Sequence, residues 1–224
     1  MGLSHALYAI FHRESIASLR DLGATLNPLF FFIMVICLIP FGMHAEKSSL
    51  EKIAVVSVWV AGLLAILLSS DQLFRQDHHE GTLEQWALSP YSLPLLLFFK
   101  VMMQWILTCF PLVLAVPFAA LFLGLPSECI PVFMLSLMLG TLILHFFNAV
   151  IAALLLGLQR GGLLISVLAL PFYVPVMILG SQSVYEVLAG QNPLALLMLL
   201  AGFFIFTITL APFAIAYAIS LSIE

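Results

Sequence analysis

The chain has 224 residues, of which 63% are hydrophobic and 8% are charged, and its mean hydropathy is +1.20. Because about one quarter of the residues in soluble domains are charged, this composition excludes a water-soluble domain and indicates an integral membrane protein. The net charge of −4 is spread thinly and no basic patch is present, so the sequence predicts no nucleic-acid partner.

Residues 3–20 precede the first long apolar stretch and show an amphipathic helical pattern. The residues that recur at helical spacing on the apolar side are Leu3, Leu7, Ile10 and Phe11. Histidine and charged side chains fill the opposite arc, so we expect residues 1–22 to form a helix in the membrane interface, with its apolar face in the acyl boundary. The first twenty residues lack the apolar core of a signal peptide, which makes the first span an uncleaved insertion signal.

Apolar runs without Asp, Glu, Lys or Arg then follow one another along the chain. These intervals are 22–45, 53–70, 101–127, 129–159, 161–185 and 187–223. Each is long enough for one helix, which needs about 20 residues to cross the hydrocarbon core, although the second is only just so. The runs are continuous rather than alternating, so they predict helices and not a β-barrel. The predicted spans are 26–43, 53–72, 93–124, 130–158, 163–180 and 193–220, with outer loops near 44–51, 125–128 and 181–191.

The predicted fold class is therefore all-α, a polytopic membrane protein with six transmembrane helices in one domain over residues 1–224. Six spans place both termini on the same side of the membrane. The cationic residues on that side are Arg13, Arg20, Arg75, Lys100 and Arg160. The opposite side holds Lys47 and Lys52. By the positive-inside rule, this excess of Lys and Arg predicts that both termini are cytoplasmic.

Residues 74–86 form the one long polar stretch in an otherwise apolar chain. Thr82 and Gln85 fit a capping box, in which the two side chains satisfy backbone N–H groups at the start of a helix. Ser89-Pro90 ends that helix, because a residue before proline avoids the α region. The pattern predicts a short helix from about residue 83 to 88.

The predicted short helix has an apolar side and an acidic side. Leu83, Trp86 and Ala87 fall on one face by their i, i+3 and i+4 spacing. The acidic residues nearby are Asp77, Glu80 and Glu84. A helix of two turns has little stability in water, so its apolar face must pack either on the chain's own inner surface or on a partner protein. A solvated loop between two spans is the remaining alternative.

This polar stretch resembles the first cytoplasmic loop of ABC-2-type permeases through the run Leu73-Phe74-Arg75-x-Asp77-x-x-x-Gly81-Thr82-Leu83-Glu84-Gln85. Further motifs are Asn27-Pro28-Leu29 with Phe31-Phe32, Leu139-Gly140-Thr141, Leu158-x-Arg160-Gly161-Gly162 and Pro212-Phe213-Ala214. In their order, and over essentially the whole chain, these motifs are similar to those of the CcmB family, haem exporter protein B of bacterial cytochrome c maturation.

The resemblance implies a permease subunit that works as a homodimer with two copies of an ABC ATPase, CcmA. Segment 74–90 is then the cytoplasmic coupling segment, seated in a groove of that ATPase. The residues that the resemblance assigns to this contact are Arg75, Asp77, Gly81, Thr82, Leu83, Glu84, Gln85 and Trp86. CcmC, CcmD and the haem chaperone CcmE are the further partners implied, and the location implied is the bacterial inner membrane.

The chain's own lysines indicate that energy must come from a partner. A Walker A loop needs Gly directly before Lys, whereas Lys47, Lys52 and Lys100 follow other residues. We therefore expect that this chain is not an enzyme and binds no cofactor. ATP is expected to bind to the ATPase subunit, and haem is expected to be handled by the complex. The resemblance leaves open haem export itself or ATP-driven release of haem-loaded CcmE, and we favour the second.

Three other functions are open alternatives: an ABC-2 permease for a lipid or polysaccharide, a secondary transporter, and a passive structural subunit of a respiratory assembly. A secondary transporter would need paired charges within the membrane. We expect no buried Asp, Glu, Lys or Arg in the spans, which argues against it.

His145 and Asn148 lie in the middle of a span, three residues apart on one helical face. A histidine within the membrane suggests haem ligation, but we favour hydrogen bonding to a neighbouring helix, since no second histidine lies at that depth. We assign neither a metal site to His78-His79 nor a haem contact to His44.

Three further expectations concern packing. Asp71 and Arg75 are expected to pair at i, i+4 spacing. Prolines inside the predicted spans, among them Pro111, are expected to kink helices whose freed carbonyls find partners on neighbouring helices. No metal or disulfide spacing is present, and membrane-embedded packing is the role expected for Cys37, Cys109 and Cys129.

Overall fold

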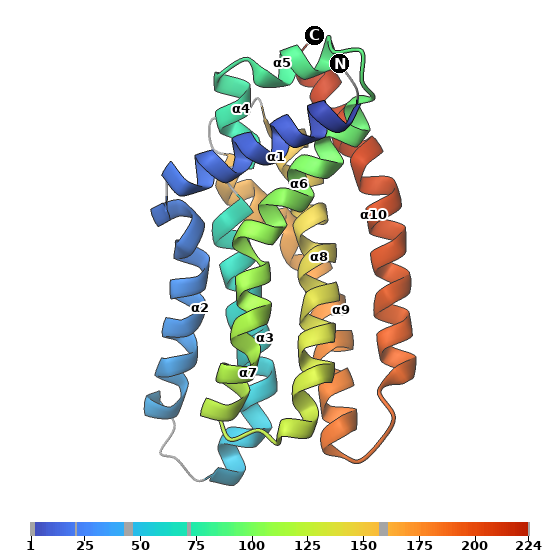
Figure 1. The fold of residues 1–224 in the computed structure, drawn as a ribbon. Coiled ribbons are helices and arrows are strands. Elements are labelled where there is room, and N and C mark those ends of the chain that lie inside the picture. Colours follow the sequence, from blue (N-terminus) through green and yellow to red (C-terminus); the bar gives the residue numbers. More distant parts are fainter. Residues whose placement is uncertain (1–2, 21, 43–46, 71–72, 157–160, 224) are drawn as a thin grey trace.

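The computed structural model describes residues 3–20, 22–42, 47–70, 73–156 and 161–223. In this part of the chain every regular element is a helix, which confirms the all-α fold class. The helices that run side by side along the molecule (Figure 1) are α2 (Leu22–Gly42), α3 (Lys47–Ser70), α6 (Leu93–Thr108) followed by α7 (Phe110–Phe122), α8 (Ile130–Leu154), α9 (Gly161–Leu188) and α10 (Leu194–Ile223). Helix α1 (Leu3–Arg20) lies across one end of this bundle.

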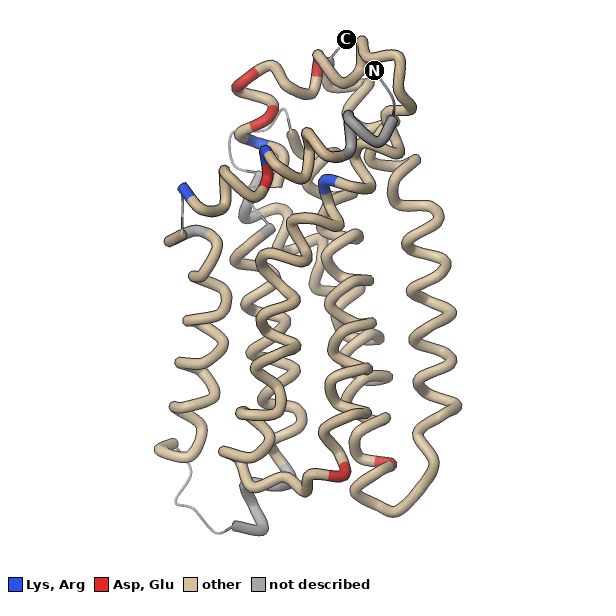
Figure 2. Tube along the Cα trace, viewed as in Figure 1, with Lys and Arg blue, Asp and Glu red and all other residues tan. Residues whose placement is uncertain are grey.

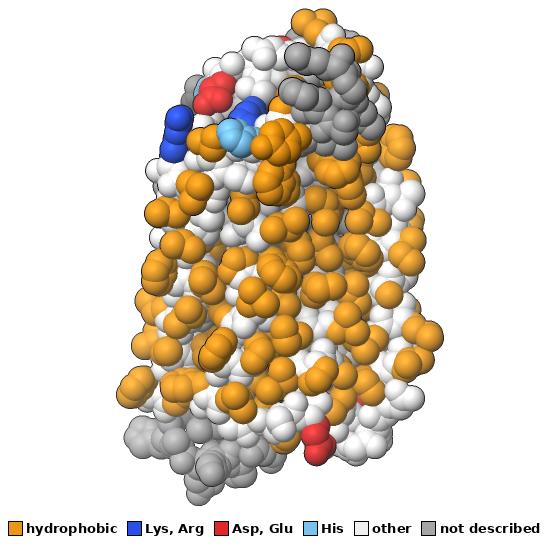
Figure 3. Space-filling view, viewed as in Figure 1, with side chains coloured by type: hydrophobic (Ala, Val, Ile, Leu, Met, Phe, Trp, Pro, Cys, Tyr) orange, Lys and Arg blue, Asp and Glu red, His pale blue; other side chains and the backbone are white. Residues whose placement is uncertain are grey.

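The bundle has the lengths and the surface of a membrane protein. Within the described residues, five helical segments are long and apolar enough to cross a membrane: Thr25–Gly42, Leu93–Phe122, Ser127–Leu154, Leu164–Leu188 and Leu194–Ser222. The apolar part of α3, Ile53–Ser69, is shorter because charged residues occupy the first turns of that helix. Hydrophobic side chains cover the flank of the bundle (Figure 3), and the charged residues gather at its two ends (Figure 2). The chain is a multi-pass membrane protein.

The third predicted span, residues 93–124, is not one continuous helix. Helix α6 ends at Thr108 and α7 begins at Phe110, with Cys109 between them. Pro111 lies in the first turn of α7, and without an N–H it cannot donate to a carbonyl of the preceding turn. The chain remains apolar through both helices, but its hydrogen-bond ladder is interrupted near the middle of the span.

Helix α9 extends beyond the predicted span, so the outer loop expected at 181–191 begins too early. The helix continues to Leu188. Ser181 and Ser183 donate from their hydroxyls to carbonyl oxygens one turn back, at 3.3 and 2.7 Å, and Ser183 is fully buried. Serines that bond to their own helix do not mark its end. The loop is confined to the residues just after 188.

Helix α1 confirms the predicted helix over residues 3–20 and shows where its faces point. Tyr8, Phe11 and Leu19 lie on the outside of the molecule. Arg13 and Glu14 are partly buried where α1 packs along α6. An interfacial helix normally turns its charged arc to water. Here the bundle covers part of that arc, because the chain itself supplies partners for the charges.

The centre of the bundle is organised around Trp59 of α3, which is fully buried where α3, α8 and α9 meet. A Cβ atom placed at Gly140 of α8 would lie 2.5 Å from Cη2 of the indole, and one at Gly180 of α9 would overlap the ring still more. The indole therefore fills the space that two missing side chains leave, and three helices approach closely around it.

Candidate functional site: a coupling segment and a buried ion cluster

The polar residues between α3 and α6 fold into two short helices at the end of the bundle where α1 lies (Figure 1). Helix α4 spans Arg75–His79 and helix α5 spans Thr82–Ala87. Gly81 joins them in the left-handed region, with φ of 68°. That region favours glycine because a Cβ is crowded there. The short helix predicted at 83–88 is present with a shift of one residue, whereas α4 was not expected.

The capping box predicted at Thr82 and Gln85 is wrong. Gly81 occupies the N-cap position, and no side chain in the described part of the chain caps α5. Gln85 is exposed, and its backbone N–H donates to the Gly81 carbonyl at 3.3 Å. The left-handed turn at Gly81, rather than a capping side chain, sets the direction in which α5 leaves α4.

Helix α5 is fixed to the bundle through one face. Leu83 is fully buried, and α5 rests against α6 and α10. Trp86 is half-buried, with Cζ of Arg13 5.0 Å from its ring centroid, which is a cation–π contact. Ala87, predicted to share this face, is exposed. The chain's own surface is therefore the packing partner of Leu83 and of part of Trp86.

Leu88, the residue after α5, is 89% exposed and lies at the end of the bundle where α4 and α5 are found (Figure 1). It adjoins the exposed Ala87 and the half-buried Trp86, so three consecutive apolar residues reach the surface away from the apolar belt. Leu88 was predicted to lie in the short helix, but its exposure was not expected. The available signal was a leucine inside a polar stretch, directly before Ser89-Pro90. An exposed apolar edge of this kind suits a contact with another protein or with the membrane surface.

The remaining polar residues of the coupling segment make local contacts. Gln76 donates from Nε2 to Oε1 of Glu80 at 2.8 Å. Nδ1 of His78 lies 3.7 Å from Oε1 of Glu84, which is an ion pair when the imidazole is protonated. Residues assigned to the ATPase contact that stay at least partly exposed are Arg75, Gly81, Thr82, Glu84, Gln85 and Trp86. The expected partner of Arg75, Asp71, lies outside the described residues.

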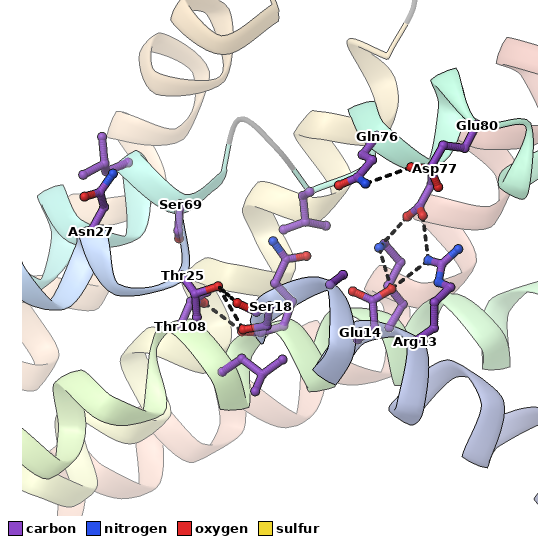
Figure 4. A pocket seen from close by; sticks show the side chains of 16 residues that line it. Arg13, Glu14, Ser18, Thr25, Asn27, Ser69, Gln76, Asp77, Glu80 and Thr108 are labelled. Carbon is purple, nitrogen blue, oxygen red and sulfur yellow. Dashed lines mark hydrogen bonds and ion pairs between the residues drawn. The ribbon is translucent and has the colours of Figure 1, made fainter. Parts of the chain in front are cut away.

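Asp77 is not part of this exposed set, because it is buried in an ion cluster (Figure 4). Its Oδ1 accepts from Nη2 of Arg13 at 2.6 Å, and its Oδ2 pairs with Nζ of Lys100. Oε1 of Glu14 accepts from the same two cations, at 2.7 Å from Arg13 and 3.1 Å from Lys100. Two cations and two anions thus form a closed ring of contacts between α1, α4 and α6.

Lys100 shows that the expectation of spans without buried charge is wrong. It lies in α6, inside the predicted span 93–124, and is 4% exposed. Its charge is tolerated there because Glu14 and Asp77 pair with it. The lone lysine in an apolar run was visible in the sequence, but its partners lie in distant segments that no spacing rule connects.

Arg13 lies outside the spanning segments, and the cluster keeps it charged. Its burial lowers the pKa of the guanidinium, but the hydrogen bond with Glu14 and the charge of Asp77 together outweigh burial and raise that pKa above its ordinary value. The positive charge that faces Asp77 and Trp86 is therefore permanent.

A polar cavity of about 250 Å³ lies beside the ion cluster (Figure 4). The charged residues that line it are the four cluster residues and Glu80. Hydroxyl and amide groups on its other sides come from Ser18, Thr25, Asn27, Ser69, Gln104 and Thr108. Such a space holds several water molecules. The residues that line the cavity belong to α1, α2, α3, α4 and α6 and to the residues next to them.

His145 of α8 is fully buried inside the chain. Its Nδ1 lies 3.7 Å from Sγ of Cys109, at the break between α6 and α7. Asn148, one turn later, donates from Nδ2 to the hydroxyl of Tyr173 in α9 at 2.5 Å. Contacts with neighbouring helices are therefore confirmed for both side chains. Among the described residues, which exclude His44, no three or more His, Cys, Asp or Glu side chains are grouped to hold a metal ion.

Comparison with known proteins gives the family. The family described as CcmB protein matches residues 5–222. This chain belongs to the CcmB family. Heme exporter protein B of Pseudomonas aeruginosa is 44% identical over 221 residues, which cover 99% of each chain. The proteins of the same name from Paracoccus denitrificans and Escherichia coli K12 are 40% and 38% identical, and the matches cover 88% and 97% of this chain and 90% and 99% of the relatives.

The CcmB family match begins within α1 and ends within α10. The helix across the end of the bundle, the coupling segment and the long helices therefore all belong to the region that the family shares. The ion cluster draws its residues from three parts of that region.

Proposed function

We propose that this chain is the transmembrane permease subunit of an ABC transporter for haem export in cytochrome c-type biogenesis. Membership of the CcmB family and relatives named heme exporter protein B support this assignment. The structural observation that carries it is the coupling segment, in which Leu83 fixes α5 to the bundle while Leu88 is exposed. A short helix held on one side, with an apolar edge on the other, suits a groove on a second protein.

In this proposal the second protein is the ABC ATPase subunit, CcmA, which hydrolyses ATP. The residues that face CcmA are Arg75, Gly81, Thr82, Glu84, Gln85, Trp86 and Leu88. Asp77 and Leu83 are buried, so they hold the segment in position instead of touching the partner. The permease works as a homodimer on a pair of CcmA subunits, and CcmC, CcmD and CcmE complete the complex.

We place the coupling segment and both termini on the cytoplasmic side of the bacterial inner membrane. Helix α1, the end of α10 and helices α4 and α5 lie at the same end of the bundle (Figure 1), so one assignment orients all of them. Arg13, Arg75 and Lys100 belong to this end. The opposite end contains Glu128, in the 3₁₀-helix η1 (Ser127–Cys129), and Glu186, near the end of α9 (Figure 2). The positive-inside rule counts Lys and Arg: Arg13, Arg20, Arg75 and Lys100 belong to the coupling end, against Lys47 and Lys52 in the first turns of α3 at the opposite end.

The packing of His145 and Asn148 supports ATP-driven release of haem-loaded CcmE better than passage of haem through this chain. His145 and Asn148 contact neighbouring helices of the same subunit, so they contribute to packing. The chain then binds no cofactor of its own, ATP belongs to CcmA, and haem is handled by the assembled complex. The permease acts as a lever whose helices transmit movement.

Co-purification of the chain with CcmA tests the proposal. Glu84→Lys reverses a charge on the outer side of α5, and Glu128→Lys makes the same change at the opposite end as a matched control. We expect Glu84→Lys to lower CcmA retention in detergent about tenfold or more, which corresponds to about 1.4 kcal/mol, and Glu128→Lys to leave it unchanged. A wild-type chain that retains no CcmA, or equal retention by the two variants, contradicts the proposal.

A further inference from the structure

Asp77 connects the coupling segment to two parts of the chain that are distant in sequence. Arg13 of α1 precedes it by 64 residues. Lys100 of α6 is also bound to Glu14, 86 residues earlier. One carboxylate of α4 thus holds the interfacial helix and a transmembrane helix at the same point (Figure 4).

Three of the four side chains of the cluster are largely buried, whereas that of Arg13 is 35% exposed. The side chains of Lys100, Asp77 and Glu14 are 5%, 6% and 12% exposed. If Asp77 moved away from Lys100, it would leave opposite charges without full compensation where water solvates them poorly, which is strongly unfavourable. Helix α4 therefore moves most easily together with α1 and α6.

Helix α6 packs against α1, α2, α8 and α10, but two of its features allow it to follow such a movement. Its far end meets α7 at Cys109, where Pro111 interrupts the hydrogen-bond ladder, and interrupted ladders are where helices bend. The half of α6 from Lys100 to Thr108 borders the polar cavity, which α1, α2 and α3 line on other sides. A helix tied at its middle through Lys100, broken at its far end and bordered by a cavity between the two is able to tilt about the break.

We propose that the cluster of Arg13, Glu14, Asp77 and Lys100 is the link through which the coupling segment moves α1 and α6. Asp77 is a positioning residue, because it is buried away from the partner and acts through Lys100 and Arg13. The inference rests on the proposed function, since an ATPase subunit must displace the segment. It gives Asp77 a role different from the direct ATPase contact that the family resemblance implies.

A mere structural anchor and a mechanical link have different consequences. An anchor that fails releases the coupling segment, so CcmA binding and transporter output fall together. A link that fails leaves CcmA bound and hydrolysing ATP, while the permease no longer responds. The complex with CcmA allows three measurements to separate these cases: CcmA retained after purification, ATP hydrolysed per complex in proteoliposomes, and c-type cytochrome matured in cells, detected by haem staining.

Asp77→Asn removes the charge while keeping the shape of the side chain. Glu80→Gln makes the same chemical change at the exposed residue that follows α4 and is the matched control. We expect Asp77→Asn to retain CcmA within about twofold and to continue hydrolysing ATP, while cytochrome c maturation falls about tenfold or more, in the range of typical coupling between sites. Glu80→Gln should match the wild type in all three measurements.

Lys100→Met removes the other half of the link. The double variant Asp77→Asn/Lys100→Met should be no worse than either single variant, because both substitutions remove the same interaction. It also leaves Arg13 and Glu14 as a balanced ion pair, so it tests the link even where a single variant inserts poorly.

Two outcomes overturn the link itself. The first is maturation within about twofold of the wild type in a double variant that retains CcmA, since typical coupling exceeds that factor. The second is a loss of CcmA in proportion to the loss of maturation, which identifies a structural anchor. A wild-type chain that retains no CcmA overturns the proposed function first, and the link falls with it.

Discussion

Leu83 and Leu88 lie on the same short helical segment, yet the first is fully buried and the second is 89% exposed. Leu83 belongs to the continuous core of the bundle, whereas Leu88 follows the last residue of α5. The two leucines therefore have different roles in the coupling segment. A change at Leu83 disturbs the packing of the segment on the bundle. A change at Leu88 disturbs the apolar edge that the segment exposes.

Leu88→Asp should lower CcmA retention about tenfold or more, because burying one leucine side chain in a contact contributes about 1.5–3 kcal/mol. The thermal stability of the purified chain should stay the same, since Leu88 is exposed. Co-purification and a thermal melt in detergent measure the two effects, and Leu88→Met is the control that keeps an apolar side chain. Full retention of CcmA by Leu88→Asp would remove Leu88 from the contact.

Gly81→Ala should strain the turn between α4 and α5 by about 1–2 kcal/mol, because an alanine Cβ is crowded at a positive φ. We expect both the thermal stability of the chain and its CcmA retention to fall. Gly124→Ala is the matched control: Gly124 also has a positive φ, 78°, but it lies between α7 and η1. That variant should lose stability alone. Equal CcmA retention by the two variants would mean that the Gly81 turn does not position the contact.

Gly180→Ala should destabilise the centre of the bundle by about 1–3 kcal/mol, because the added methyl group meets the indole of Trp59. Gly202→Ala adds the same methyl group where nothing lies within 4 Å, and it should not lower the melting temperature, because alanine is favoured over glycine inside a helix. Leucine at position 59 lacks the ring atoms that clash. The double variant Trp59→Leu/Gly180→Ala should therefore have a higher melting temperature than Trp59→Leu alone. Equal melting temperatures for the two glycine variants would contradict this packing.

Much of the fold could be predicted from sequence because charge-free intervals mark helices in a membrane. The limits of those intervals do not mark the ends of helices where polar side chains form hydrogen bonds with their own helix. Ser181 and Ser183 bond to their own helix, so α9 continues through residues that suggested a loop. At Cys109 the error is the reverse, because Pro111 was expected to kink a continuous helix and instead separates two.

The coupling segment was predicted by its local polarity and by its likeness to a family, but its connections were not. Spacing along one segment shows that Leu83 and Trp86 share a face, and the structure confirms burial for Leu83. It does not show that Asp77 meets Arg13 and Lys100, because those contacts depend on how α1 and α6 are arranged in space. Long-range ion pairs have no sequence period.

Cysteine labelling in intact cells should show that the coupling end of the bundle is cytoplasmic. Cysteines at Ser127 and Asn192, both exposed at the opposite end, should react with a membrane-impermeant thiol reagent, and one at His79 should react only after permeabilisation. Ser183 is unsuitable for labelling because it is fully buried. Cys109 and Cys129 are buried too, so Cys37→Ser removes the one exposed native thiol among the described residues. The reverse pattern would contradict the orientation and the CcmA contact together.

The purified complex of this chain with CcmA, without CcmC and CcmE, should bind no stoichiometric haem. His145 is the histidine at membrane depth among the described residues, and it is enclosed by its own subunit beside Cys109. A haem iron would have to displace that packing to reach the imidazole. The absorption spectrum after haem addition and gel filtration measures binding through the Soret band.

His145→Ala should therefore change stability rather than haem content. Truncating a fully buried side chain leaves a cavity and costs on the order of 2–5 kcal/mol, so the melting temperature should fall. His79→Ala, at an exposed position on α4, should leave both the melting temperature and the spectrum unchanged. A stoichiometric Soret band in the wild-type complex that disappears in His145→Ala and persists in His79→Ala would show that His145 is a haem ligand, and that this chain conducts haem instead of acting as a lever.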